Sequence, residues 1–193
     1  VGAGGTRPGA RAGSAAGRAG GGGPVGEGSV GAGAGATVGK LFGPAGAMKG
    51  GIGTASVRRP DGVVVAALVA VNALGDVVDP ATGAVVAGVR TEDGKRLADA
   101  RVLLRSQGSA NPLSPGANTT IAIVATNARL TKVQASRMAL MADDGLARAI
   151  NPSHTPADGD TVFALATGRW QGQSDVSTIG ALAAEALSEA IVR

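Results

Sequence analysis

The stretch Asn118-Thr119-Thr120-Ile121-Ala122-Ile123-Val124-Ala125-Thr126-Asn127 carries the clearest structural signal in the chain. Its β-branched apolar run predicts a buried strand over Ile121 to Thr126, and the turn-rich segment from Asn111 to Ala117 precedes it. Thr119 and Thr120 occupy the first positions of this strand, where β-propensity favours threonine in any case. Two interpretations remain open, because these threonines either simply begin a strand or place a nucleophilic hydroxyl at its mouth.

A nucleophilic hydroxyl needs a base, and the only histidine, His154, lies in a loop with no evident relation to this strand. A break between Asn118 and Thr119 would supply one, because the new α-amino group would lie beside the Thr119 hydroxyl. An α-amine titrates at about pH 8, so it can act as a general base near neutral pH. Threonine paired with its own terminal amine is a known type of nucleophile.

Composition limits the class of protein. The 193 residues are enough for one domain with a sizeable core. Only Phe42, Phe163 and Trp170 are aromatic, so the core must be built from Val, Ile, Leu and Ala. The absence of cysteine excludes disulfides and thiolate chemistry and is compatible with a reducing compartment. We expect a cytoplasmic protein.

Charge and hydropathy argue against nucleic-acid and membrane partners. No apolar run approaches the roughly 20 residues that a membrane helix needs, and no signal-peptide pattern is present. Of the net charge of +4, residues 1–23 contribute +3 through three arginines, while the other 170 residues carry 15 basic and 14 acidic side chains. The folded part therefore has no basic stripe that would indicate nucleic-acid binding.

The pattern along the chain divides it into a leader and one domain. Residues 1–23 are Gly, Ala and Arg without apolar periodicity, and we expect this leader to be disordered. Residues 24–193 form a single domain of strands and helices in α+β layers. The predicted strands cover 52–58, 63–71, 77–79, 84–89, 121–126 and 160–167, and the predicted helices cover 99–105, 130–150 with Thr131 as N-cap, and 175–192.

The Gly-rich segment from Gly31 to Lys40 does not encode a nucleotide site. A phosphate-binding loop needs Gly and Ser or Thr where this chain has Ala34 and Leu41, and the dinucleotide pattern also fails. Alternating Gly and Ala is better suited to close backbone packing or to lining a site. A lone His154 without cysteine does not indicate a metal site. We expect neither cofactor nor metal.

With these residues laid out, the chain resembles the DmpA-type L-aminopeptidase/D-esterase family, which includes the β-aminopeptidases. Four stretches carry the resemblance: GEGSVGAGAGATVGK (26–40), KGGIGTAS (49–56), NTTIAIVATNA (118–128) and HTPADGDTVFALATG (154–168). It covers about residues 24–193. It implies a layered αββα sandwich of the DmpA/ornithine acetyltransferase type. The family's N-terminal portion has no counterpart in residues 1–23, so we expect the sandwich to be incomplete at its N-terminal end.

The resemblance also implies the site residues. Family precursors cut themselves before a Ser or Thr, which here would be the Asn118–Thr119 bond, giving parts 24–118 and 119–193 with Thr119 as the nucleophile. Asn72 matches an asparagine that contributes to the oxyanion hole. Asp158 and Asp160 match a hydroxyl and a carboxylate that orient the nucleophile, so Asp158 departs from the family pattern.

Three functions follow as hypotheses. The first is a self-processing aminopeptidase or amidohydrolase that acts on small peptides, amides or esters through an acyl-enzyme, and that we expect to be a homo-oligomer. The second is an acyltransferase of the ornithine acetyltransferase type, which uses the same acyl-enzyme with an amine acceptor. The third is an inactive truncated fragment, which the missing N-terminal portion favours.

Overall fold

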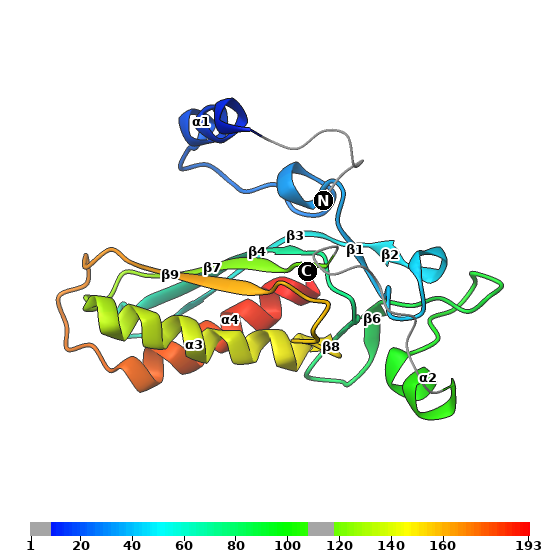
Figure 1. The fold of residues 1–193 in the computed structure, drawn as a ribbon. Coiled ribbons are helices and arrows are strands. Elements are labelled where there is room, and N and C mark those ends of the chain that lie inside the picture. The colour runs from blue at the N-terminus through cyan, green and yellow to red at the C-terminus, as the bar shows by residue number, and fades with distance from the viewer. Residues whose placement is uncertain (1–8, 108–117) are drawn as a thin grey trace.

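The structure is a computed structural model that describes residues 9–107 and 118–193. Its centre is a four-stranded sheet with the order β3-β4-β7-β9 (Figure 1). Strands β3, β4 and β7 pair antiparallel, whereas β9 pairs parallel to β7. The bounds of these strands are Gly51–Arg58 (β3), Val64–Val71 (β4), Ile121–Thr126 (β7) and Thr161–Ala166 (β9).

Two long helices, α3 (Lys132–Ala149) and α4 (Val176–Val192), cover one face of this sheet and pack against each other (Figure 1). Their first turns are fixed by side-chain caps: Thr131 forms a capping box with Gln134, and Asp175 accepts hydrogen bonds from two backbone N–H groups of α4. The core between helices and sheet consists of Val, Ala, Leu and Ile with the buried Met138, as the composition predicted. These contacts fix β7 and β9 relative to each other.

A smaller sheet with the order β6-β5-β8 lies at the end of the central sheet where β4 finishes. The buried carboxylate of Asp76 holds this region together, because it accepts hydrogen bonds from the N–H groups of Val89 at 2.8 Å and Ala100 at 2.7 Å. Its elements are β5 (Asp76–Val78), β6 (Val85–Ala87), β8 (Ile150–Asn151) and the helix α2 (Ala100–Gln107).

The Gly-rich N-terminal part adds short elements: β1 (Thr37–Val38), β2 (Met48–Lys49) and two 3-10 turns, η1 (Gly31–Gly33) and η2 (Pro44–Gly46). Close backbone packing explains part of its glycine content. A Cβ added at Gly33 would lie 2.6 Å from the Ile52 nitrogen, and one at Gly39, whose φ is +71°, would lie 2.2 Å from the Gly88 carbonyl carbon. The expectation that glycine here permits close packing is confirmed.

The leader contains a helix that the sequence analysis did not predict. Residues Ala10–Ala19 form α1, none of whose residues is buried, and α1 lies apart from the two-layer body in Figure 1. Ala and Arg favour helix formation, which offsets the glycines within this segment. The structure thus gives these ten residues a regular helix where the sequence analysis expected none.

The second face of the central sheet is open among the described residues. The apolar residues of the predicted strand 63–71 were expected to be covered on both faces. Burial instead alternates along β4, because Val65, Ala67, Val69 and Val71 are buried and the residues between them are only partly buried. On the open face the exposed fractions are 52% for Ile121 and 57% for Phe163. The prediction of coverage on both faces is wrong for this part of the chain.

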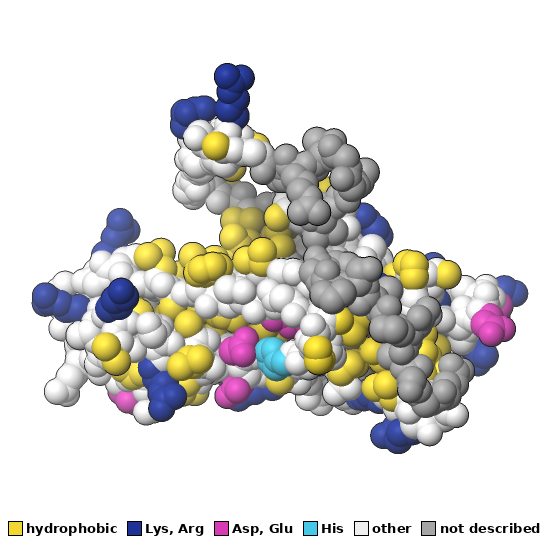
Figure 2. All heavy atoms as spheres, viewed as in Figure 1, with side chains coloured by type: hydrophobic (Ala, Val, Ile, Leu, Met, Phe, Trp, Pro, Cys, Tyr) yellow, Lys and Arg dark blue, Asp and Glu magenta, His cyan; other side chains and the backbone are white. Residues whose placement is uncertain are grey.

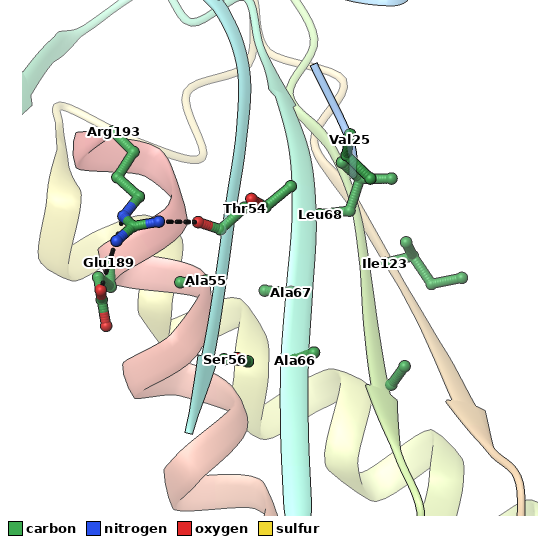
Figure 3. A pocket seen from close by; sticks show the side chains of 11 residues that line it. Val25, Thr54, Ala55, Ser56, Ala66, Ala67, Leu68, Ile123, Glu189 and Arg193 are labelled. Carbon is green, nitrogen blue, oxygen red and sulfur yellow. Dashed lines mark hydrogen bonds and ion pairs between the residues drawn. The ribbon is translucent and has the colours of Figure 1, made fainter. Parts of the chain in front are cut away.

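Figures 2 and 3 show this open face. Hydrophobic side chains lie along the sheet on the side away from the helices (Figure 2). Leu68 and Ile123 project from that side beside Val25, in a pocket of about 420 Å³ (Figure 3). The α+β class is confirmed. The described residues provide the four-stranded sheet with its helix layer and two smaller sheets, β1-β2 and β6-β5-β8. None of them forms a second large sheet that covers the open face, as an αββα sandwich would require.

The close contact between α4 and β3 gives a stability prediction. A Cβ at Gly53 would lie 1.8 Å from the Ala190 carbonyl oxygen, so Gly53→Ala forces the helix away from the sheet. We expect the free energy of unfolding, measured by urea denaturation, to fall by about 1–3 kcal/mol. Ser56→Ala at an exposed position of the same strand should change it by less than about 0.5 kcal/mol. Equal stability of both variants would contradict this packing.

Candidate active site

Thr119 lies just before β7, and a backbone hydrogen bond to Asn72 fixes its position. Its N–H donates to the Asn72 carbonyl oxygen at 2.9 Å. Its hydroxyl donates to the Asn118 carbonyl oxygen at 2.7 Å, which is the carbonyl of the predicted cleavage bond. Asn118 is fully buried and Thr119 is half-buried. The structure therefore places the predicted nucleophile against the bond it is expected to cut.

The segment before β9 lies alongside this bond. Asn118 and Asp158 form a parallel bridge that continues the pairing of β7 with β9. Within it the Gly159 N–H donates to the Asn118 carbonyl oxygen at 2.8 Å. Two residues after Asp158, Asp160 Oδ1 accepts a hydrogen bond from the Thr120 N–H at 2.8 Å. The parallel register brings these residues together although about 40 positions separate them in the sequence.

Asn72 lies at the end of β4 and is buried. Its side-chain oxygen accepts hydrogen bonds from the Thr37 N–H at 3.1 Å and from Lys40 Nζ at 2.9 Å, while its backbone carbonyl receives the Thr119 N–H. Asn72 therefore lies directly beside Thr119, which agrees in position with what the resemblance implied. Its contribution to an oxyanion hole through the side-chain NH₂ group stays a prediction.

Lys40 is a site residue that the sequence analysis missed. Its side chain is buried and reaches both oxygens of Asn72, with Nζ 2.9 Å from the side-chain oxygen and 3.4 Å from the backbone oxygen. Burial lowers the pKa of the Lys40 ammonium to about 8, and the negative charge of Asp158 opposes that shift. A lysine at the end of a Gly-rich segment was the available signal, but it was considered only as part of a phosphate loop.

The two predicted carboxylates have different surroundings. Asp158 Oδ1 accepts the Leu74 N–H at 3.2 Å, and its Oδ2 accepts the Thr155 hydroxyl at 2.7 Å, so it ties the segment before β9 to the residues after Asn72. The side chain of Asp160 is largely buried, and burial raises the pKa of its carboxyl group, opposed by the hydrogen bond from the Thr120 N–H. Both carboxylates flank Gly159 and fix its backbone.

His154 is closer to the site than its sequence position suggested. Its Nδ1 lies 3.8 Å from Asp160 Oδ2, and its Nε2 lies 3.7 Å from Asp143 Oδ2 on α3. Figure 2 shows the imidazole at the surface between acidic side chains. The view that His154 belongs to an unrelated loop is therefore wrong, since its ring lies beside Asp160.

Residues 9–107 and 118–193 contain no cluster of three or more His, Asp or Glu side chains with the arrangement of a metal site. None of their helices combines the length and hydropathy needed to cross a bilayer. The pocket on the open sheet face includes none of Asn72, Thr119, Asp158 and Asp160.

Comparison with known proteins identifies similar chains. An uncharacterized aminopeptidase of Mycobacterium tuberculosis (strain ATCC 25618 / H37Rv) is 42% identical over 165 residues, which are 77% of this chain and 48% of that protein. The structure of a Burkholderia sp. β-aminopeptidase matches with a TM-score of 0.58 and 30% identity, over 88% of this chain and 46% of the other. This chain thus spans about half the length of the curated relatives it matches.

The fold and the family agree. The L-aminopeptidase D-Ala-esterase/amidase from Ochrobactrum anthropi, described as a variant of the Ntn hydrolase fold, matches with a TM-score of 0.54 at 23% identity, over 88% of this chain and 44% of the other, and so supports the fold alone. The family model of peptidase family S58 matches residues 4–193, and thus includes most of the leader that the sequence resemblance left out. These matches confirm the DmpA-type resemblance, and the chain belongs to peptidase family S58.

Proposed function

We propose that this chain carries the nucleophile of a self-processing aminopeptidase, with Thr119 as the nucleophile and Asn118–Thr119 as the bond that it cuts. The observation that supports this most directly is the position of the Thr119 hydroxyl, which donates to the Asn118 carbonyl oxygen at 2.7 Å. Membership of an aminopeptidase family supplies the reaction class. We propose aminopeptidase activity for the whole protein on the basis of this family membership.

Self-cleavage would begin with the Thr119 hydroxyl. Its Oγ1 forms a bond to the Asn118 carbonyl carbon, the peptide C–N bond breaks, and the proton lost by Oγ1 ends on the Thr119 nitrogen. Water then hydrolyses the resulting ester, leaving an Asn118 carboxylate and a free Thr119 with both amine and hydroxyl. The adjacent strand pairing holds both sides of the bond during this step.

The freed α-amine then serves as the base for substrate. The Asn72 carbonyl oxygen, which accepts the Thr119 N–H in the uncut chain, stays in position to orient the amine. The amine takes the proton from Oγ1 as the hydroxyl attacks a substrate amide or ester, and returns it to the leaving group. Water releases the acyl group from Oγ1. Small peptides, amides and esters all fit this chemistry.

The buried polar side chains around Asn72 would orient its amide for the reaction with substrate. Because Lys40 and the Thr37 N–H both donate to the Asn72 side-chain oxygen, the amide has a fixed orientation. Asn72 would use its NH₂ group to stabilise the oxyanion of the substrate. Asp160 would hold the Thr119–Thr120 backbone through the Thr120 N–H, and the Asp158 charge would favour the ammonium form of Lys40.

Two single substitutions at neighbouring threonines test the proposed nucleophile, one as the test and one as its control. Thr119→Ala removes the attacking oxygen, so intact mass under denaturing conditions should show only full-length chain. Thr120→Val is the matched control, because the buried Thr120 hydroxyl has no hydrogen-bond partner among the described residues and valine keeps its shape. This variant should give two polypeptides separated at Asn118–Thr119, as the unmodified chain should. Cleavage at that bond in Thr119→Ala would exclude Thr119.

The charge state of Lys40 gives a second prediction. In a lysine side-chain NMR titration, one signal should titrate with a pKa of about 8 and should be missing from Lys40→Met. Asp158→Asn removes the charge that favours the ammonium, so the pKa should fall further. Because the folded pKa is below 10.5, the unfolded chain binds more protons between these values. The free energy of unfolding should therefore rise with pH there, relative to Lys40→Met.

A result in which every lysine titrates near its ordinary value of 10.5 would contradict the buried position of Lys40. An unchanged pKa in Asp158→Asn would contradict only the coupling between these two side chains.

Hydrolysis and acyl transfer differ in the molecule that accepts the acyl group, which is water in the first and an amine in the second. With an amino-acid p-nitroanilide as substrate, we expect nitroaniline release in buffer alone, because water completes the turnover of the acyl-enzyme. Added hydroxylamine should divert part of the acyl group to the hydroxamate. Release that begins only after an amine is added would favour the acyltransferase instead. Thr119→Ala serves as the inactive control in both arms.

A further inference from the structure

We propose that the backbone N–H of Gly159 is the oxyanion donor for self-cleavage of the Asn118–Thr119 bond. This inference rests on the proposed function, because it concerns the same bond. Gly159 N lies 2.8 Å from the Asn118 carbonyl oxygen, where negative charge would develop as Thr119 Oγ1 attacks. An effective donor lies about 2.7–3.1 Å from that position, so this distance fits.

Among the described residues the Asn118 carbonyl oxygen has two donors, the Thr119 hydroxyl and the Gly159 N–H, and only the second can remain during attack. The Thr119 hydroxyl donates to the oxygen at 2.7 Å, but it must give up that bond when Oγ1 turns toward the carbonyl carbon. The Gly159 N–H takes no part in bond making or breaking. As the π electrons of the carbonyl move onto its oxygen, the Gly159 N–H is the donor that stays. Their return expels the Thr119 nitrogen, which takes up the proton lost by Oγ1.

The donor belongs to a regular strand pairing, which is what fixes it in place. The next equivalent bond runs from the Thr161 N–H to the Thr120 carbonyl oxygen at 3.0 Å, followed by the β7–β9 pairs. The neighbours of Gly159 are also held, since Asp158 accepts the Leu74 N–H and Asp160 accepts the Thr120 N–H. A donor fixed before the reaction needs no reorganisation, which is the property of an effective oxyanion hole.

Space around Thr119 explains why this position is glycine. Gly159 does not adopt a positive φ, so its backbone conformation does not require glycine. A Cβ there would lie 2.9 Å from Thr119 Oγ1 and 3.7 Å from the Asn118 oxygen. Any larger residue would press on the attacking atom. Glycine therefore lets the donor approach the carbonyl while leaving the hydroxyl free to move.

The test removes this N–H by an amide-to-ester exchange, and a control ester makes the same backbone change elsewhere. Glycolic acid is incorporated at position 159 of the full chain, which replaces the amide by an ester and keeps the size of the residue. The matched control has glycolic acid at position 168, where the Gly168 N–H donates to the Ala128 carbonyl oxygen at 3.2 Å, beyond the far ends of β7 and β9. The rate at which polypeptide 119–193 appears is followed by mass spectrometry, with circular dichroism to verify folding.

We expect the ester at 159 to slow self-cleavage by about 100-fold or more, and the ester at 168 to leave the rate within a few-fold. Equal slowing by both esters, or none at 159, would overturn the role of Gly159 while leaving self-cleavage intact. An unmodified chain that stays uncut would instead overturn the proposed function and this inference with it.

A second measurement does not depend on the ester variant folding. In uncut Thr119→Ala, NMR should detect scalar coupling across the hydrogen bond between the Gly159 nitrogen and the Asn118 carbonyl carbon. Its absence would overturn the proposal, because the donor would then not be in place before the reaction.

Discussion

The parallel pairing of β7 with β9 is the constraint on which the site depends. It continues past both strands to the bond between the Gly159 N–H and the Asn118 carbonyl oxygen. The helices α3 and α4 hold the sheet from one face, with α3 forming part of the connection that parallel strands require. The Asn118–Thr119 peptide bond, which we propose is cut, is thereby held at the end of a packed sheet.

A second set of contacts comes from the N-terminal half of the described chain. Lys40, Asn72 and Asp158 join the Gly-rich segment, the end of β4 and the segment before β9. Burial makes the Lys40 ammonium less stable, and the Asp158 charge partly restores it. Such a cluster costs stability unless its polar atoms are satisfied, and perturbed side chains of this kind are typical of functional sites. The site thus needs parts on both sides of the Asn118–Thr119 bond.

Local sequence patterns predicted the helices and strands well. Features that depend on packing between distant segments were not predicted. The β-branched run gave β7 over Ile121–Thr126, and Thr131 marked the start of α3. The family resemblance implied Thr119, Asn72, Asp158 and Asp160 as site residues; the structure brings them close together, and their roles stay predictions. Gly159 and Lys40 were missed, because their positions depend on strand register and on backbone packing between distant segments, which periodicity does not encode. The uncovered face of β4 was missed because an apolar run does not reveal which layers are present.

The central claim is that Thr119 carries a free amine next to its hydroxyl after self-cleavage. Periodate tests this directly, because it oxidises a 1,2-amino alcohol only at an N-terminal Ser or Thr. The account predicts that polypeptide 119–193 is converted to the aldehyde at its first residue and loses activity. A purified protein that remains one full-length species and resists periodate would contradict it.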